Sequence, residues 1–481
     1  MIKEITLVFT PFSLQNHSEG ESEIDKYKAL AFNLWKNFAH RKCDEPYLEE
    51  ILPTNTNPIS LGQLCLASYL QARGIKVNYV HGDYFIKQSN QNMEDFISYL
   101  IDISSQSSLI GFYSMTPTID VAMSLIHGVK KKNPSIITVL GGPHGTYTDI
   151  EMLKKYKHLD VVSRGEGEET LYELALESSK AIPNFSNIKG ITFSSRGNVV
   201  RNEDRELLLA ENIPAPDYSL LPRDFNCLLT VMYARGCPFR CKFCAEGNIW
   251  RHKLRFRSAE HVAQEIKYIN DNWPQRVIHI CDSEIDAVPK KLEELLSAIE
   301  KLDINVKFTV NIRCDAHKRL TPAIVNRMKK IGVVAYLIGV ESASDHMLEC
   351  MGRQSVFSDF IKTIDLLNLC DAGFIFPGVM VGFPGETPET LRETKRQFLK
   401  LLREDRIDYF FPKLFIPYPG TEPYEKQKEY GIKLNDKWSE FARFGLQQPF
   451  KLKKFDGADL KTEMLDFYER IVECYETKNN Q

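Results

Sequence analysis

Three of the chain's eleven cysteines lie within eight consecutive residues. Cys237, Cys241 and Cys244 follow the spacing C-x3-C-x2-C. Thiolates this close together would converge on a metal, whereas a structural zinc site takes four protein ligands, usually as two separated pairs. No second Cys/His pair has that spacing, and His252, the nearest histidine, is more simply a loop residue. We expect an iron–sulfur cluster with three protein ligands and one open iron, with zinc as the alternative.

The segment after a strand-like run, C-x3-C-x-aromatic-C with Phe243 as the aromatic residue, resembles the signature of the radical S-adenosylmethionine (SAM) superfamily. The resemblance implies a [4Fe–4S] cluster held by Cys237, Cys241 and Cys244, with the amino and carboxylate groups of SAM on the fourth iron. One-electron reduction would cleave SAM to methionine and a 5′-deoxyadenosyl radical, which abstracts hydrogen from a substrate. Phe243 would form a wall beside the adenine.

Later strand ends carry further residues that match this superfamily. Glu284, in "CDSEID", would receive the SAM amino group, although D-S-E departs from the more familiar G-G-E. Arg313, in "NIRCD", would pair with the SAM carboxylate as a fork donor. A hydrogen bond or ion pair at the barrel rim is the alternative for each of these residues. The remaining expected SAM contacts lie in "IGVESAS" and in the glycine-rich "GVMVGFPGET", and they are Glu341, Ser342, Gly378 and Gly382.

Three earlier strand ends resemble the cobalamin-binding domain that precedes the barrel in one branch of the superfamily. They read "GFYSMT", "VLGGPHGTYTD" and "SRGEGEETLYEL". Glycines would let the nucleotide tail of a corrinoid pass close to the sheet, and hydroxyls would hydrogen-bond to it. Capping of the next helix is the alternative role for the glutamates. The expected cobalamin contacts are Ser114, Thr116, Gly141, Gly142, Pro143, Gly165, Glu166 and Gly167.

Many corrinoid domains carry D-x-H-x-x-G, whose histidine ligates cobalt. Here only "QNHSEG" occurs, with Gln15 at the aspartate position, so His17 would lack the carboxylate that orients a metal-bound imidazole. We expect His17 to be a surface residue and cobalt to bind without a protein histidine. A domain that has lost cobalamin and keeps only its shape is the alternative.

Alternating strand and helix patterns determine how these residues would be positioned. They predict the α/β class, with a doubly wound, Rossmann-like sheet followed by six strand–helix repeats that form a partial (β/α)6 barrel. The insertion at about 13–58 is expected to be a lid or a docking surface. The C-terminal segment is expected to be a helix that docks on the barrel. The expected units are a cobalamin-binding domain at 1–180, a linker at 181–222, a radical SAM barrel at 223–440 and a helical extension at 441–481.

The leading functional hypothesis is a cobalamin-dependent radical SAM methyltransferase acting on an unactivated carbon or phosphorus. In this class one SAM would methylate the corrinoid and another would supply the radical. The alternatives are an oxidoreductase or cyclase that uses cobalamin for a rearrangement, a radical SAM enzyme with a vestigial cobalamin domain, and a binding module that serves a partner. A complete barrel argues against the last of these.

Composition limits the partners. A formal net charge of −3 gives no electrostatic case for nucleic acid, and no apolar run approaches the roughly 18 residues of a membrane span. We therefore expect a cytoplasmic enzyme with a small-molecule or peptide substrate. An electron donor such as flavodoxin or ferredoxin would reduce the cluster.

Overall fold

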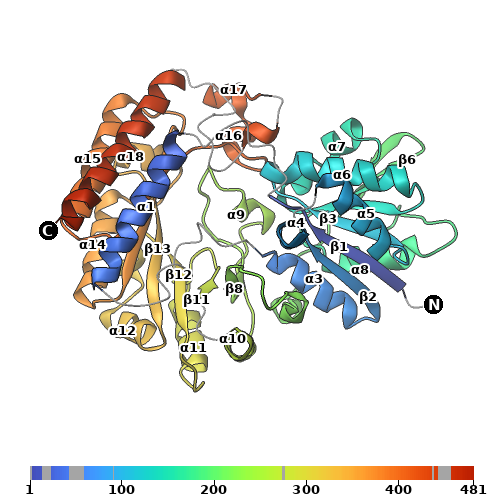
Figure 1. The fold of residues 1–481 in the computed structure, drawn as a ribbon, viewed down its shortest axis with the longest axis horizontal. Helices are drawn as coiled ribbons and strands as arrows, with labels where there is room; N and C mark the ends of the chain where they lie inside the picture. The colour runs from blue at the N-terminus through green and yellow to red at the C-terminus, as the bar shows by residue number, and fades with distance from the viewer. Residues whose placement is uncertain are drawn as a thin grey trace.

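The computed structural model describes residues 3–12, 23–42, 59–89, 92–273, 277–435, 438–441 and 457–480. Its elements form two α/β units joined side by side (Figure 1). In the described part of the chain, no helix is both long and apolar enough to span a bilayer. His17 and the other residues of 13–22 lie outside the described residues, so the expectation for them stays a prediction.

The N-terminal unit contains a seven-stranded sheet in the order β2-β1-β3-β4-β5-β6-β7. The first five strands are parallel, as continuous apolar runs such as "LIGFY" favour. The strand order reverses between β1 and β3, where ligands of such sheets bind beyond the carboxyl ends of the strands. The parallel strands are β1 (Lys3–Phe9), β2 (Ile75–His81), β3 (Leu109–Tyr113), β4 (Ile137–Gly141) and β5 (Val161–Ser163).

Helices cover both faces of this sheet, which confirms the doubly wound class (Figure 1). Ser60 caps the first of them, because its side chain accepts a hydrogen bond from the backbone N–H of Gln63 at 3.3 Å. The helices are α3 (Leu61–Gln71), α4 (Gly82–Ser89), α5 (Met93–Ile103), α6 (Ile119–Lys132), α7 (Pro143–Lys155) and α8 (Glu168–Ser178).

The range 181–222, expected to be a linker, contributes two further strands to this sheet. β6 (Ile191–Ser195) pairs antiparallel with β5, and β7 (Asn198–Arg201) pairs antiparallel with β6. Arg196 and Gly197 both have positive φ, +48° and +83°, which suits the tight turn of a β-hairpin. The sheet therefore extends to residue 201, and the proline-rich connection begins after the hairpin.

The second unit is a partial barrel of six parallel strands in the order β15-β14-β13-β12-β11-β8. All six segments expected from the sequence form strands, and this confirms the barrel. The strands are β8 (Leu229–Val231), β11 (Val277–Ile280), β12 (Lys307–Arg313), β13 (Val333–Glu341), β14 (Phe374–Val381) and β15 (Phe411–Leu414). The helices around them are α10 (Ala259–Asn272), α11 (Pro289–Ile299), α12 (Pro322–Lys330), α13 (Asp345–Cys350), α14 (Phe357–Leu369) and α15 (Pro388–Arg403).

The insertion between β1 and β2 supplies a helix to the other unit. Helix α1 (Glu23–Lys42) lies beside the C-terminal helix α18 (Gly457–Asn479) on the barrel (Figure 1). Trp35 of α1 is 1% exposed and makes edge contacts with the rings of Phe374 and Phe376 at centroid distances of 5.9 and 5.5 Å. In its described part, the insertion is therefore a packed element of the barrel core, unlike the lid or docking surface expected from its length.

Helix α18 docks on the barrel through the apolar face that the sequence predicts. Leu460, Met464, Phe467, Ile471 and Cys474 are all buried. The ammonium of Lys395 on α15 forms ion pairs with Glu463 and with Asp466 of α18, the second at 2.8 Å.

Candidate active site

The cysteine loop is a closed excursion from a short antiparallel pair. β9 (Ala234–Arg235) leads into it and β10 (Arg255–Phe256) leads out, with the short helix α9 (Glu246–Ile249) between them. Gly236 has a φ of +109°, and a Cβ there would overlap the carbonyl oxygen of Lys253. Only glycine therefore lets the loop close at this point.

A buried aspartate at the end of β11 holds the strand that enters the loop. The carboxylate of Asp282 accepts hydrogen bonds from the backbone N–H groups of Tyr233 at 2.7 Å and Ala234 at 3.0 Å. Burial raises the pKa of Asp282 to about 7, against the effect of these two donors. Asp282 is not among the site residues predicted from the sequence. Through these two hydrogen bonds it positions the strand that enters the loop.

The three thiols of the loop are all partly buried, and the space beside them is the candidate cluster site. Burial raises the pKa of Cys237 to about 11 and that of Cys244 to about 12. The negative charges of Glu284 and Cys241 raise the pKa of Cys237 further, which places these groups close together. A bound metal ion lowers the pKa of a thiol, because the metal binds the thiolate form. Three closely spaced cysteines therefore suit a metal cluster.

Arg353 brings a positive charge to this space, although it is absent from the residues predicted by the sequence. Its Nη1 lies 3.7 Å from the Sγ of Cys241, and its Nη2 lies 3.4 Å from the Sγ of Cys314 and donates to the carbonyl of Gly339. The "MGR" that follows helix α13 is the only sequence signal for it. Arg353 therefore links the cysteine loop to the end of β13.

Glu341 stands at a backbone irregularity beside this arginine. Its φ is +76°, and the register between β13 and β14 shifts between Gly339 and Glu341. Burial raises the pKa of Glu341, while the charges of Arg353 and Lys413 lower it. A left-handed conformation in a non-glycine residue costs of order 1–3 kcal/mol, and such strain concentrates at functional sites.

Glu284 and Arg313 lie near the loop, and part of the Arg313 side chain is already engaged. Burial and the neighbouring Asp286 raise the pKa of Glu284. Arg313 Nε donates to Asp315 at 2.9 Å, and its guanidinium stacks 3.7 Å from the ring centroid of Phe239 in the cysteine loop. Arg313 therefore stabilises the cysteine loop through Phe239.

The glycine-rich segment at the end of β14 contains Gly378 and Gly382, and their expected contact with SAM stays a prediction. Gly382 has a φ of +83°, and its N–H donates to the carboxyl of Glu386, whose pKa burial raises to about 8. A Cβ on Gly378 would come no closer than 3.7 Å to a described atom, the carbonyl oxygen of Ile338, so this strand leaves an open approach. Phe243 packs at the edge of a buried cluster that contains Met347.

Ser342 is directed away from this space. It is fully buried, and its hydroxyl exchanges a hydrogen bond with Thr394 of α15 at 3.0 Å. The backbone N–H of Ser344, two residues further along the chain, donates to the same hydroxyl at 3.1 Å. In this structure Ser342 fastens a helix to the strand end, so its expected contact with SAM stays a prediction.

Besides two nitrogens of Arg255, four buried atoms of charged side chains in the barrel unit have no hydrogen-bond partner among the described residues. Buried polar atoms are nearly always paired, so these point to a bound group. Two are carboxyl oxygens and two are guanidinium nitrogens, a donor set that fits an amino acid with its ammonium and carboxylate. They are Glu284 Oε2, Arg313 Nη2, Arg353 Nε and Glu386 Oε1. The loop and its surroundings thus suit an iron–sulfur cluster with SAM.

The carboxyl edge of the N-terminal sheet presents the glycine turn expected to hold cobalamin. Gly142 has a φ of +99°, and a Cβ there would lie 2.5 Å from the carbonyl oxygen of Ser114. Gly141 ends β4, and Pro143 is the first residue of α7. Only glycine lets the backbone pass this close to the β3 end, which suits a turn built for close approach of a ligand.

The two hydroxyls expected at this edge already have protein partners. Ser114 exchanges a hydrogen bond with Thr118 at 3.0 Å, and Thr116 does so with His144 Nδ1 at 3.1 Å. Burial lowers the pKa of His144 to about 3, so the ring is neutral, and its Nε2 has no partner in the part of the chain that the structure describes. This unsatisfied nitrogen and the glycine turn fit a corrinoid tail.

The neighbouring turn joins the two units. Gly165 donates its N–H to Thr146 at 3.1 Å, and a Cβ on Gly167 would lie 3.1 Å from Leu66. The carboxylate of Glu166 forms ion pairs with Arg235 at 2.7 Å and Arg255 at 2.9 Å. Both arginines belong to the β9–β10 pair that leads into and out of the cysteine loop, which we call the neck of the loop. The expected contact of Glu166 with cobalamin stays a prediction, since the structure commits this carboxylate to arginines.

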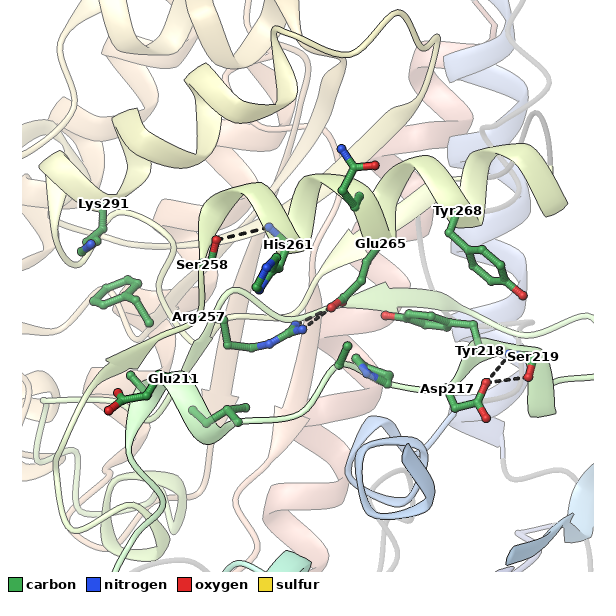
Figure 2. A pocket seen from close by; sticks show the side chains of 16 residues that line it. Glu211, Asp217, Tyr218, Ser219, Arg257, Ser258, His261, Glu265, Tyr268 and Lys291 are labelled. Carbon is green, nitrogen blue, oxygen red and sulfur yellow. Dashed lines mark hydrogen bonds and ion pairs between the residues drawn. The ribbon is translucent and has the colours of Figure 1, made fainter. Parts of the chain in front are cut away.

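A well-formed cavity lies elsewhere, beside helix α10 of the barrel unit (Figure 2). It measures about 870 Å³ and lies between residues 210–219 and helix α10. Arg257 and Glu265 form an ion pair in its wall (Figure 2). None of the residues predicted as site residues lines it.

Comparison with known proteins identifies two domains. The Radical SAM superfamily model matches residues 231–398, and the B12 binding domain model matches residues 54–175. The chain is 28% identical over 380 residues to the uncharacterized methyltransferase PH0819 of Pyrococcus horikoshii. The alignment covers 75% of this chain and 79% of that protein. It is 26% identical over 420 residues to the anaerobic magnesium-protoporphyrin IX monomethyl ester cyclase of Rubrivivax gelatinosus, covering 84% and 72%.

Solved structures share the fold of both units. The radical SAM methyltransferase TsrM from Kitasatospora setae, with cobalamin and a [4Fe-4S] cluster bound, superposes with a TM-score of 0.66 at 15% identity, covering 96% of this chain and 85% of that one. The cobalamin-dependent SAM radical enzyme OxsB, with aqua-cobalamin bound, superposes with a TM-score of 0.70 at 16% identity, covering 96% and 66%. The order of the two units is therefore a shared architecture.

Proposed function

Because this chain joins a B12-binding domain to a radical SAM domain, we propose that it is a cobalamin-dependent radical SAM methyltransferase. The observation that carries the proposal is the position of the two candidate sites. The cysteine loop and the glycine turns of the N-terminal sheet meet at one interface, where Glu166 contacts Arg235 two residues before Cys237. Cofactors at the two sites would act on one substrate between them.

At the barrel, Cys237, Cys241 and Cys244 would hold the [4Fe–4S] cluster. Glu284, Arg353 and Glu341 would bind the amino-acid end of SAM through the buried polar atoms and charges described above. When an external donor reduces the cluster, the cluster and SAM together would supply a 5′-deoxyadenosyl radical. The chain's own contribution is to orient SAM and to shield the site from water. We propose flavodoxin or ferredoxin as the donor and the cytoplasm as the location, as the sequence predicts.

At the N-terminal unit, the turn at Gly141, Gly142 and Pro143 would accept the corrinoid tail. Gly165, Gly167 and the Ser114 and Thr116 backbone would border it. Cobalamin supplies a transferable methyl group there. His144 would donate or accept one hydrogen bond through its unsatisfied Nε2, because its ring stays neutral above pH 3. The domain bounds that we propose are 1–180 with the hairpin to residue 201, then 223–440.

Similarity to the Rubrivivax gelatinosus cyclase over 84% of this chain favours a second candidate, an oxidative ring closure. Both candidates keep the same cofactors and differ in what happens to the methyl group of SAM. We propose a small molecule or a peptide as the substrate in either case, and not nucleic acid.

The two candidates are separated by the fate of SAM. Reconstituted, anaerobic protein would be incubated with a low-potential reductant and SAM, with and without hydroxocobalamin. A methyltransferase is expected to form S-adenosylhomocysteine in a cobalamin-dependent way. Formation of 5′-deoxyadenosine alone, whether or not cobalamin is present, would contradict methyl transfer and favour the cyclase or a vestigial cobalamin domain. Protein that binds neither cofactor would contradict both.

A further inference from the structure

Four charged side chains connect the neck of the cysteine loop to the N-terminal unit. Arg235 and Arg255 are paired residues of β9 and β10. Arg235 donates to Glu166 Oε1 and to Glu168 Oε1, both at 2.7 Å. Arg255 Nη1 donates to both oxygens of Glu166, at 3.1 and 2.9 Å. Two carboxylates of the N-terminal unit therefore balance the two arginines at the base of the loop, and Glu166 contacts both of them.

These ion pairs are buried, so breaking one of them would destabilise the contact between the two units. The side chains of Arg235, Glu166 and Glu168 are 3–4% exposed, and Arg255 is 11% exposed. The ring of Trp250, itself in the cysteine loop, lies 5.8 and 5.5 Å from the two guanidinium groups. Removing one partner of a buried ion pair leaves an uncompensated charge. The two units cannot separate here, or rotate, without exposing or orphaning these groups.

The same turn is bonded to the glycine turn at the sheet edge. Gly165, next to Glu166, donates its N–H to the hydroxyl of Thr146 at 3.1 Å. That hydroxyl donates to the carbonyl of Gly142 at 2.9 Å. Two hydrogen bonds, the peptide bond between Gly165 and Glu166, and an ion pair thus connect Gly142 to Arg235, two residues before Cys237.

We propose that Glu166 and Glu168 are positioning residues that couple the two cofactor sites, so that cobalamin at the glycine turns slows loss of the cluster from the cysteine loop. The inference rests on the proposed function, because it takes those two groups as the occupants. The physical reason is that a ligand that orders the turn at 165–168 also fixes the neck of the loop. By linkage, any gain in the equilibrium affinity for the cluster is matched by an equal gain in the affinity for cobalamin.

The test measures each cofactor separately in the full-length, reconstituted protein. Iron transfer to a ferrous chelator is followed with and without hydroxocobalamin, and cobalamin affinity is measured by absorbance with and without the cluster. In the unmodified chain cobalamin is expected to slow iron loss at least about fivefold, the lower end of ordinary coupling between sites. Glu166→Gln is expected to abolish this effect, and Glu168→Gln, which affects only the contact with Arg235, to reduce it.

Glu265→Gln is the matched control, because Glu265 is also a buried carboxylate paired with an arginine, Arg257, but within the barrel unit. It is expected to keep the full effect of cobalamin. Equal iron loss with and without cobalamin in the unmodified chain, or full coupling in Glu166→Gln, would overturn the inference. If Glu166→Gln does not fold, full coupling in Glu168→Gln overturns it instead. An unmodified chain that binds no cobalamin or no cluster would contradict the proposed function itself.

Discussion

The guanidinium of Arg353 lies 3.7 Å from the thiol of Cys241, although 112 residues separate them in the chain. The same group contacts the end of β13 and faces Glu341. Arg353 therefore connects the cysteine loop to the strand ends where SAM would bind. Its Nε has no partner among the described residues.

Arg353→Met is expected to weaken SAM binding at least about tenfold, which corresponds to about 1.4 kcal/mol. The substitution removes the positive charge next to Glu341 and a donor for the SAM carboxylate. Titration calorimetry on reconstituted protein would measure the affinity. Arg406→Met, which breaks a partly exposed pair with Asp365, is the control. Unchanged affinity in Arg353→Met would remove this residue from the proposed SAM site.

Cys237→Ala, Cys241→Ala and Cys244→Ala are each expected to lose the cluster, because two thiolates hold a [4Fe–4S] cluster too weakly. Iron and sulfide analysis should give about one cluster per chain for the unmodified protein and a small fraction of that for the variants. Cys370→Ala, a half-buried cysteine at the end of α14, should leave the content unchanged. Full cluster content in Cys237→Ala would contradict the site.

Gly142→Ala is expected to abolish retention of cobalamin through desalting. The new Cβ would lie 2.5 Å from Ser114 O, and the left-handed φ of +99° is unfavourable for alanine. Gly197→Ala is the matched control, since its φ of +83° is also positive but its Cβ would meet no described atom within 4 Å. The absorbance of retained hydroxocobalamin gives the readout. Equal retention by both variants would show that the turn at Gly142 does not hold the corrinoid.

Glu386 predicts a pH dependence of stability. Burial raises its pKa from 4.5 to about 8 in the folded chain, so the folded state holds one more proton than the unfolded state between these values. The free energy of unfolding should fall as the pH rises through this window and level off above pH 8. Denaturant unfolding of the SAM-free protein at pH 5.5 and 8 would measure this fall.

Glu386→Gln should flatten that dependence by up to about 1.4 kcal/mol per pH unit, the limit for a single group. Glu389→Gln, at an exposed carboxylate in the first turn of α15, should leave it unchanged. A slope in Glu386→Gln equal to that of the unmodified chain would show that Glu386 does not titrate in this range.

Trp35→Ala is expected to destabilise the barrel by about 3–5 kcal/mol, because it removes a large side chain that is 1% exposed. Its partners Phe374 and Phe376 belong to β14, so the loss should be felt in the barrel and not in the N-terminal sheet. Leu30→Ala on the same helix, where the side chain is 42% exposed, is the control. Equal stability of the two variants would contradict a core role for α1.

Local sequence patterns predict most of the architecture. The cysteine spacing, the strand–helix alternation and the glycine at each tight turn are properties of short segments, so they are readable without the fold. Six barrel strands and five parallel strands of the N-terminal sheet appear where the apolar runs predict them. The hairpin at β6 and β7 was less readable, because exposed strands at a sheet edge, such as β7, carry little apolar alternation.

Tertiary structure alone decided the contacts that join distant segments. Helix α1 packs on the barrel because its apolar face fits α18 and β14, although it is inserted between two strands of the other unit. Glu166 reads as a helix cap or a ligand in sequence, yet it pairs with Arg235, 69 residues away. Residue types and local spacing determine which chemistry the chain can perform. Which charges are buried together depends on how the two units pack, because a buried carboxylate must find its partner wherever the fold brings one.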